Sequence, residues 1–64
     1  MNVGEKMKER RKELGMTLEE VGNIVGVGKS TVRRWENGMI KNMSVAWLEP
    51  IAKALKMDVI DLLK

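Results

Sequence analysis

The chain contains neither cysteine nor histidine among its 64 residues. The absence of cysteine excludes disulfides, thiolate metal sites and a thiol nucleophile. The absence of histidine removes the commonest general base, the catalytic triads that depend on it, and most zinc or copper sites, which leaves carboxylates for acid–base chemistry. These absences argue against an enzyme, and we expect no catalytic residue, no metal and no cofactor.

Aromatic residues and long apolar runs are also scarce. Trp35 and Trp47 are the only aromatic residues, so the core must be built from aliphatic side chains and methionine. No apolar run approaches the roughly 20 residues of a membrane span, and charges lie near the N-terminus where a signal peptide would need a hydrophobic stretch. We expect a cytoplasmic protein with no membrane contact and infer no small-molecule ligand.

Size and charge are those of one small basic domain, which we expect to cover residues 1–64. A chain this short buries only about 60% of the surface that its unfolded form exposes, so its stability is marginal. Twelve basic residues against nine acidic ones give a net charge of +3. This modest excess suits a polyanionic partner.

Apolar residues recur at helical spacing in short blocks that glycines separate. No stretch alternates with period two over a useful length, so the sequence predicts an all-α domain of five helices. The apolar residues at this spacing are Val3, Met7, Leu14, Leu18, Val21, Ile24, Val25, Val32, Trp35, Leu48, Ile51, Ala52, Leu55, Val59, Leu62 and Leu63.

Capping patterns indicate where the helices begin and end. Two capping boxes, in which a cap residue is followed three positions later by Glu, start the first two helices. Glycines after the first and third helices are natural stops. The expected elements are a helix of about a dozen residues from Asn2 to Gly15, one over about 18–25 capped by Thr17 with Glu20, one ending near Asn37, a fourth, and a short fifth capped by Asp58.

Pro50 restricts where the fourth helix can begin. Ser44 is a candidate cap, but counted from Ser44 the proline falls beyond the first turn, where its ring clashes with a carbonyl group and its missing N–H removes a hydrogen bond. Either the helix is kinked at Pro50, or its regular part starts later. We favour a later start, around residues 46–47.

Residues 18–37 have the spacing of two short helices that cross through a tight turn. Gly22 allows the backbones to approach, and Gly26 can adopt a left-handed conformation without steric cost. On the third helix, Val32 and Trp35 form a dry face, and Glu36 lies at its border. The opposite arc, about 140° wide at 100° per residue, carries Lys29, Ser30, Arg33, Arg34 and Asn37.

The excess positive charge of the chain is concentrated in this third helix and the loop after it. Residues 28–43 hold four basic residues and one acidic residue, whereas the rest of the chain holds eight of each. Such a cluster is commonly an ordinary solvated helix face. It would instead face phosphates if the helix entered the major groove of DNA.

The chain resembles, over residues 3–63, the phage repressor and Cro type of helix-turn-helix domain, the Xre-like family of bacterial transcription regulators. The residues that carry the resemblance are RKELGMT, the Gly22 and Gly26 turn, STVRRWENG and the trailing LEPIAKAL. It implies a five-helix, lambda-repressor-like domain that binds double-stranded DNA sequence-specifically as a transcription regulator, as a repressor in the simplest case. Such domains often bind as dimers on near-palindromic operators.

Position by position, the resemblance implies roles for nine residues. Lys29, Ser30 and Arg34 match base readers, and Arg33 matches a residue that reads an outer base or contacts phosphate. Thr17, Asn37 and Lys41 match positions that touch the sugar-phosphate backbone. Arg11 and Glu36 match a pair that in several members forms an ion pair between the first and third helices.

Two residues support an alternative function as a protein-interaction module, such as an antitoxin or adaptor, with little affinity for DNA. Leu18 stands where many family members have a Gln that touches phosphate, and Trp47 lies off the apolar stripe of the fourth helix. Gly28 also differs from the usual Ser or Thr cap of the third helix. For the expected homodimer on DNA, the candidate interface residues are Trp47, Val59, Ile60, Leu62 and Leu63, unless all of them close the core.

Overall fold

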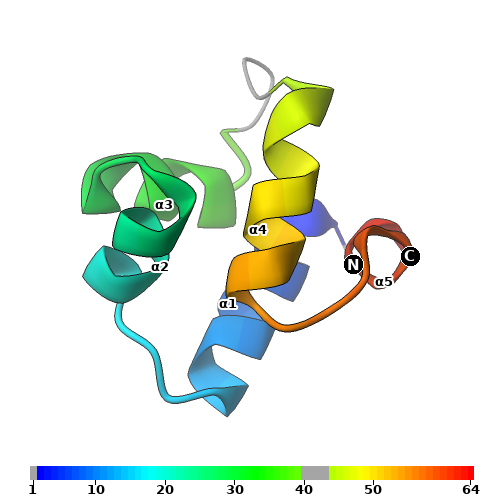
Figure 1. The fold of residues 1–64 in the computed structure, drawn as a ribbon, viewed down its shortest axis with the longest axis horizontal. Coiled ribbons are helices and arrows are strands. Elements are labelled where there is room, and N and C mark those ends of the chain that lie inside the picture. Colours follow the sequence, from blue (N-terminus) through cyan, green and yellow to red (C-terminus); the bar gives the residue numbers. More distant parts are fainter. Residues whose placement is uncertain (1, 40–43) are drawn as a thin grey trace.

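The computed structural model describes residues 2–39 and 44–64, and within these residues it consists of five α-helices and one 3-10 turn, with no strand. The elements are α1 (Val3–Glu13), α2 (Leu18–Val25), α3 (Lys29–Glu36), the 3-10 turn η1 (Val45–Trp47), α4 (Leu48–Ala54) and α5 (Val59–Leu63). Figure 1 shows α2 and α3 side by side at one end of the molecule, α4 beside them with α1 behind it, and α5 at the other end. The predicted all-α class with five helices is confirmed.

The start of α2 is the better formed of the two expected capping boxes. The Glu20 amide donates to Thr17 Oγ1 at 3.0 Å, and the Thr17 amide donates to Glu20 Oε1 at 2.8 Å. At α1, the Glu5 amide donates to Asn2 Oδ1 at 2.9 Å. Asp58 occupies the N-cap position of α5, as expected, but its side chain makes no capping hydrogen bond there.

The start of α4 explains how the chain accommodates Pro50. Ser44 Oγ accepts a hydrogen bond from the Ala46 amide at 3.0 Å and so caps η1. The α-helix itself begins at Leu48, which makes Pro50 its third residue. The amides of the first turn have no helical partner, so proline loses no bond there. The regular helix therefore starts later than Ser44, as expected, just beyond residues 46–47.

All five helices contribute to the core, and its buried apolar residues are Met7, Val21, Val25, Val32, Trp35, Ile51, Ala52, Ala54, Leu55 and Leu62. Two of the apolar residues at helical spacing are exposed: Ile24 at 59% and Leu63 at 55%. Ile24 faces a part of α4 formed by Glu49, Pro50 and Lys53, which does not cover it. Leu63 lies about 100° around α5 from Leu62, which is buried in the core.

Two glycines allow close backbone contacts. A Cβ atom on Gly22 would lie 2.6 Å from the Val27 carbonyl oxygen, so the predicted close approach at this position is confirmed. Gly26 has a φ of 95°, the left-handed turn expected between α2 and α3. A Cβ atom on Gly4 would overlap the carbonyl oxygen of Trp35, so α1 can lie against the end of α3 only with glycine there.

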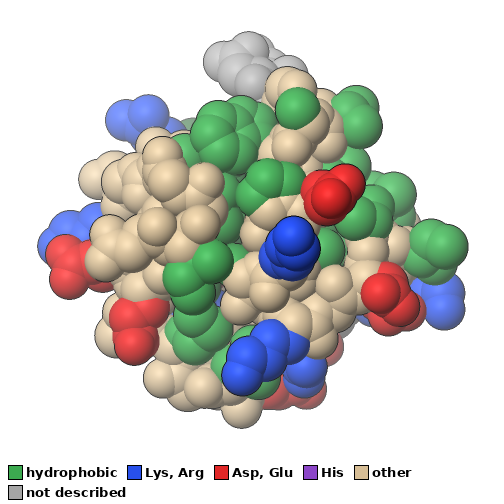
Figure 2. Space-filling view, viewed as in Figure 1, with side chains coloured by type: hydrophobic (Ala, Val, Ile, Leu, Met, Phe, Trp, Pro, Cys, Tyr) green, Lys and Arg blue, Asp and Glu red, His purple; other side chains and the backbone are tan. Residues whose placement is uncertain are grey.

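The surface on the side of α4 is mixed in character. Figure 2 shows hydrophobic side chains along the boundary between the α2–α3 pair and α4, with charged side chains of both signs over α4. Among the described residues, no helix has the length and hydropathy needed to span a membrane.

Candidate nucleic-acid interface

The two sides of α3 differ in both burial and charge. Val32, Trp35 and Glu36 are buried. The exposed side consists of Lys29, Ser30, Arg33 and Arg34, followed by Asn37 at the C-cap. The structure thus places all five residues of the predicted arc on one continuous surface. In Figure 1, α3 lies at the outer edge of the molecule, away from α5, so this surface faces solvent.

The three cations of this surface are not neutralised within the described part of the chain. The ion pairs formed there involve other residues, and none includes Lys29, Arg33 or Arg34. Their charge is therefore directed to solvent, where it is available to a polyanion. Lys41, the fourth cation of the predicted site, lies outside the described residues.

The start of α2 contributes one further polar group. Thr17 is exposed, and its Oγ1 accepts the capping bond from the Glu20 amide. Because a hydroxyl group both accepts and donates, its hydrogen stays available for a second partner. Glu19 and Glu20 are also exposed in this first turn, so a phosphate group would meet carboxylates beside the Thr17 hydroxyl.

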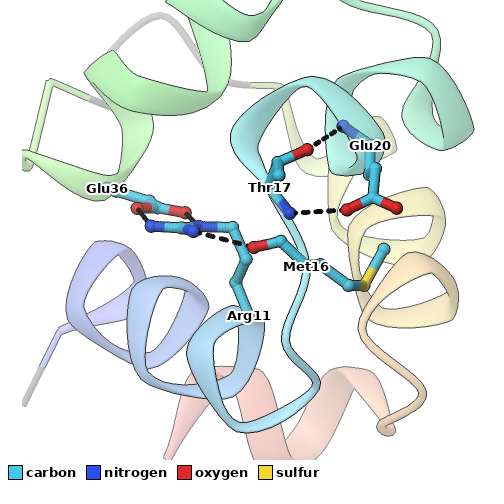
Figure 3. Close-up of polar contacts among 5 residues, drawn as sticks. All are labelled: Arg11, Met16, Thr17, Glu20 and Glu36. Carbon is cyan, nitrogen blue, oxygen red and sulfur yellow. Dashed lines mark hydrogen bonds and ion pairs between the residues drawn. The ribbon is translucent and has the colours of Figure 1, made fainter.

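Arg11 of α1 and Glu36 of α3 form a paired, largely buried contact behind the exposed surface (Figure 3). Arg11 Nε donates to Glu36 Oε2 at 2.7 Å, and Arg11 Nη2 donates to Glu36 Oε1 at 3.1 Å. The third bond runs from Arg11 Nη1 to the Met16 carbonyl oxygen at 2.9 Å. The side chains are 13% and 4% exposed, respectively. One guanidinium group thus connects α1, α3 and the segment that leads into α2.

This pairing also affects the electrostatics of α3. At 100° per residue, Glu36 projects next to Lys29, at the border of the exposed surface. An unpaired carboxylate there would offset part of the positive charge of the helix. Because Arg11 forms a bidentate bond with Glu36, its negative charge is balanced from behind.

The sequence did not indicate the role of Arg10, whose hydrogen-bond partners, Leu55 and Lys56, lie far away along the chain. Arg10 Nε donates to the Leu55 carbonyl oxygen at 2.9 Å, and Nη2 donates to the Lys56 carbonyl oxygen at 3.2 Å. Both acceptors lie at the C-terminal end of α4, where carbonyl groups lack helical partners. The sequence also gave no sign of the left-handed conformation of Lys56, which has a φ of 54°, because no glycine occupies that position.

The two tryptophans differ in exposure. Trp35 is buried in the core, as its position on the dry face of α3 predicted. Trp47 is half-buried, packs against the core and has its ring centroid 5.8 Å from that of Trp35. Of the other candidate dimer residues, Leu62 is fully buried, so its assignment to an interface was wrong, and Val59 is half-buried. Ile60 and Leu63 are exposed.

The described residues contain no group of three or more carboxylate, histidine or cysteine side chains able to hold a metal ion. The fold and the exposed face of α3 are those of a helix-turn-helix protein. The family model described as Helix-turn-helix matches residues 7–62. The chain belongs to this family, and within it to the phage repressor and Cro type.

Known relatives include DNA-associated regulators. The HTH-type transcriptional regulator SinR of Bacillus subtilis (strain 168) is 34% identical over 61 residues, which are 95% of this chain and 55% of SinR. The chain therefore spans about half the length of the curated relatives it matches. The solved structure of SinR with DNA has a TM-score of 0.86 at 34% identity and covers 97% of this chain and 98% of the solved chain.

Two further solved structures show in which kinds of protein this fold occurs. The P22 c2 repressor in complex with a synthetic operator has a TM-score of 0.89 at 30% identity, over 100% of this chain and 96% of the repressor chain. The hydroxypropylphosphonic acid epoxidase from S. wedmorenis has a TM-score of 0.88 at 27% identity, over 97% of this chain and 32% of the enzyme chain. Because one fold occurs in a repressor and in part of an enzyme, the function has to be argued from the surface.

Proposed function

We propose that this chain binds double-stranded DNA sequence-specifically, with α3 in the major groove, as the DNA-binding part of a bacterial or phage transcription regulator that acts as a repressor. The observation that carries the proposal is the exposed face of α3, where Lys29, Arg33 and Arg34 project without a carboxylate partner among the described residues. The solved complexes of the P22 c2 repressor with operator and of SinR with DNA support it.

The proposed base readers are Lys29, Ser30 and Arg34, with Arg33 reading an outer base or binding phosphate. Arg34 has the chemistry for the most specific contact, because a guanidinium group can donate two parallel hydrogen bonds to O6 and N7 of guanine. Such a contact discriminates against other bases by about 1–3 kcal/mol. Thr17, Asn37 and Lys41 are the proposed contacts to the sugar-phosphate backbone.

We also propose that the chain binds DNA as a homodimer. One copy offers only the few contacts of a single α3, which is little for high specificity. Two copies related by a two-fold axis would place their recognition helices in successive major grooves, with half-sites about 34 Å apart.

The alternative, a protein-interaction module, rested on Leu18 and Trp47. Both side chains are partly buried and pack against the core, so neither is left as a fully exposed contact for a partner protein. A salt titration against random duplex DNA separates the two functions. A DNA-binding domain shows an affinity that falls steeply with salt, whereas an interaction module shows weak binding and a shallow slope.

The decisive experiment selects bound duplexes from a random pool, with the chain alone and with the chain fused to a dimerising segment. We expect a consensus half-site, enriched as an inverted repeat with the fusion. Arg34→Ala should then relax the preference at one base pair of that half-site by about 5- to 150-fold, the equivalent of 1–3 kcal/mol. Lys53→Ala, which removes an exposed cation of α4, is the charge-matched control and should keep the preference.

Two results would contradict the proposal. A pool that yields no enriched sequence, with either form of the chain, would exclude sequence-specific binding. Arg34→Ala weakening the binding of every duplex equally would show that Arg34 only neutralises phosphate.

A further inference from the structure

A small surface pocket flanks α3 on the side where Arg34 emerges. Its volume is about 260 Å³, and its lining residues are Val27, Thr31, Arg34, Trp35, Met39 and Trp47. Arg34 is the only charged residue among them. Lys29 and Arg33, the other two cations of the exposed surface, do not border it.

The position of Arg34 on α3 explains this difference. At 100° per residue, Arg34 lies at one edge of the exposed arc, next to Thr31 and Trp35, whereas Lys29 lies at the opposite edge. Arg34 therefore borders two surfaces at once. One is the solvent-facing arc that we propose enters the major groove, and the other is a largely apolar wall.

Trp47 provides a fixed part of that wall. It ends the η1 turn, in which the Ala46 amide donates to the Ser44 side chain. Its ring lies 5.8 Å from the ring of Trp35, measured between centroids, at an interplanar angle of 49°. Because Trp35 is buried in the core, Trp47 is held from behind, and its half-buried side chain is left to shape the pocket beside Arg34.

An apolar wall of this kind restricts the conformations of a long cationic side chain beside it. A solvated arginine samples many rotamers and loses that freedom when it binds. An indole face attracts a guanidinium group and allows it to stack, which narrows the range of orientations before DNA arrives. Two parallel bonds to guanine need one particular orientation, so prior ordering favours selectivity more than simple charge attraction does.

We propose that Trp47 is a positioning residue, which orients Arg34 across the pocket and thereby sets the base selectivity of the interface. This inference rests on the proposed function, since it assigns a cause to the selectivity of the same site. Trp47 itself contacts no base. Lys29 and Arg33 do not line this pocket, so Trp47 has no such effect on them.

The test uses two substitutions that keep an apolar side chain in the wall. Trp47→Phe retains an aromatic face, whereas Trp47→Leu removes it and keeps a smaller apolar side chain against Trp35. The measured quantity is the ratio of affinities for the selected duplex and for the same duplex altered at the base pair that Arg34→Ala identifies. We expect Trp47→Leu to lower this ratio about fivefold or more, and Trp47→Phe to lower it less than twofold, with the salt slope unchanged in both.

A double-mutant cycle separates positioning from a general loss of structure. In an Arg34→Ala background, Trp47→Leu should leave the affinity ratio unchanged, because the group it orients is absent. Thermal melting of each variant ensures that binding is measured well below its unfolding temperature.

Three outcomes would overturn the role of Trp47: an unchanged ratio in Trp47→Leu, an equal loss in Trp47→Phe, or a further loss in the Arg34→Ala background. These differ from failure of the proposed function itself. In that case Arg34→Ala would not alter the ratio at any base pair, or no sequence would be selected at all.

Discussion

At the scale of single residues, the most consequential contact is the one that the Arg11 guanidinium group makes behind α3. It bonds to both carboxylate oxygens of Glu36 and to the Met16 carbonyl oxygen, so one side chain joins α1 to α3 and to the segment before α2. A buried charge without its partner is strongly unfavourable. The orientation of α3, and with it the exposed cationic face, depends on this contact.

Glu36→Gln should therefore lower the free energy of unfolding by about 3–5 kcal/mol, because it leaves the Arg11 charge without a counter-charge in a largely buried site. In a domain of this size each kcal/mol lowers the melting temperature by about 4–8 °C. Glu9→Gln on the exposed side of α1 is the matched control and should change stability little. Replacing both partners, as in Arg11→Met with Glu36→Leu, should restore much of the loss. Glu36→Gln melting at the parental temperature would show that the pair does not hold the fold.

Gly4→Ala tests the close approach of α1 to α3 and sets two effects against each other. Alanine is a better helix former than glycine by about 1 kcal/mol, but its Cβ atom would overlap the Trp35 carbonyl oxygen, a backbone atom that cannot rotate away. We expect the overlap to prevail and the variant to be destabilised by about 1–3 kcal/mol in urea unfolding. Gly28→Ala, at a glycine with open space around it, should cost less. A Gly4→Ala variant more stable than the parent would mean that α1 shifts without cost.

At the scale of elements, local sequence signals were sufficient to predict most helices. They did not predict the contacts between helices. The capping box at Thr17 and Glu20 and the left-handed turn at Gly26 are encoded within a few residues, so α2 and the turn could be predicted. Pro50 likewise placed the start of α4 after Ser44. By contrast, the hydrogen bonds of Arg10 to the end of α4 join residues that are separated by 45 and 46 positions in the sequence. No local pattern marks them.

The face of α3 was predictable for a similar reason, since the helical period alone separates Val32 and Trp35 from the basic residues. The exposure of Ile24 was not, because it depends on which part of α4 faces α2. The ion pair of Arg11 with Glu36 was suggested by family resemblance and not by spacing. Only the folded chain shows its third bond, to the Met16 carbonyl oxygen.

Thr17 allows the capping of α2 to be tested together with its proposed role toward DNA. Thr17→Ala removes the acceptor for the Glu20 amide and should destabilise the domain by about 1 kcal/mol. It also removes the hydroxyl group that we propose donates to phosphate. Thr17→Ser keeps both functions and is the control. Thermal melting and duplex affinity should both fall in Thr17→Ala and be nearly retained in Thr17→Ser. Unchanged melting in Thr17→Ala would show that the cap contributes nothing.

At the scale of the whole molecule, the excess positive charge belongs to one short segment of the chain. Eight basic and eight acidic residues balance outside residues 28–43, and the net charge of +3 belongs to α3 and the segment after it. Because the same fold also forms about a third of an epoxidase, the proposed DNA-binding function rests on this asymmetry of charge and not on the fold alone.

This asymmetry predicts how binding responds to salt. If each copy neutralises about four phosphates, the logarithm of the affinity should fall with the logarithm of the salt concentration with a slope of about −3.6 per copy. Removing one phosphate contact reduces the magnitude of the slope by about one. Arg33→Ala therefore distinguishes the two proposed roles of Arg33. A smaller salt slope indicates that Arg33 contacts a phosphate, and a lost base preference indicates that it contacts a base. Lys53→Ala should alter neither quantity, and if it lowers the slope as much as Arg33→Ala, the charge of α3 has no special role.

The most direct test of a DNA-reading α3 is backbone amide chemical-shift mapping of the ¹⁵N-labelled chain as the selected duplex is added. The largest changes should fall in Lys29–Glu36 and at the start of α2, with α5 nearly unaffected. Changes centred on α5 or on the outer side of α4, with α3 unperturbed, would contradict the proposed interface.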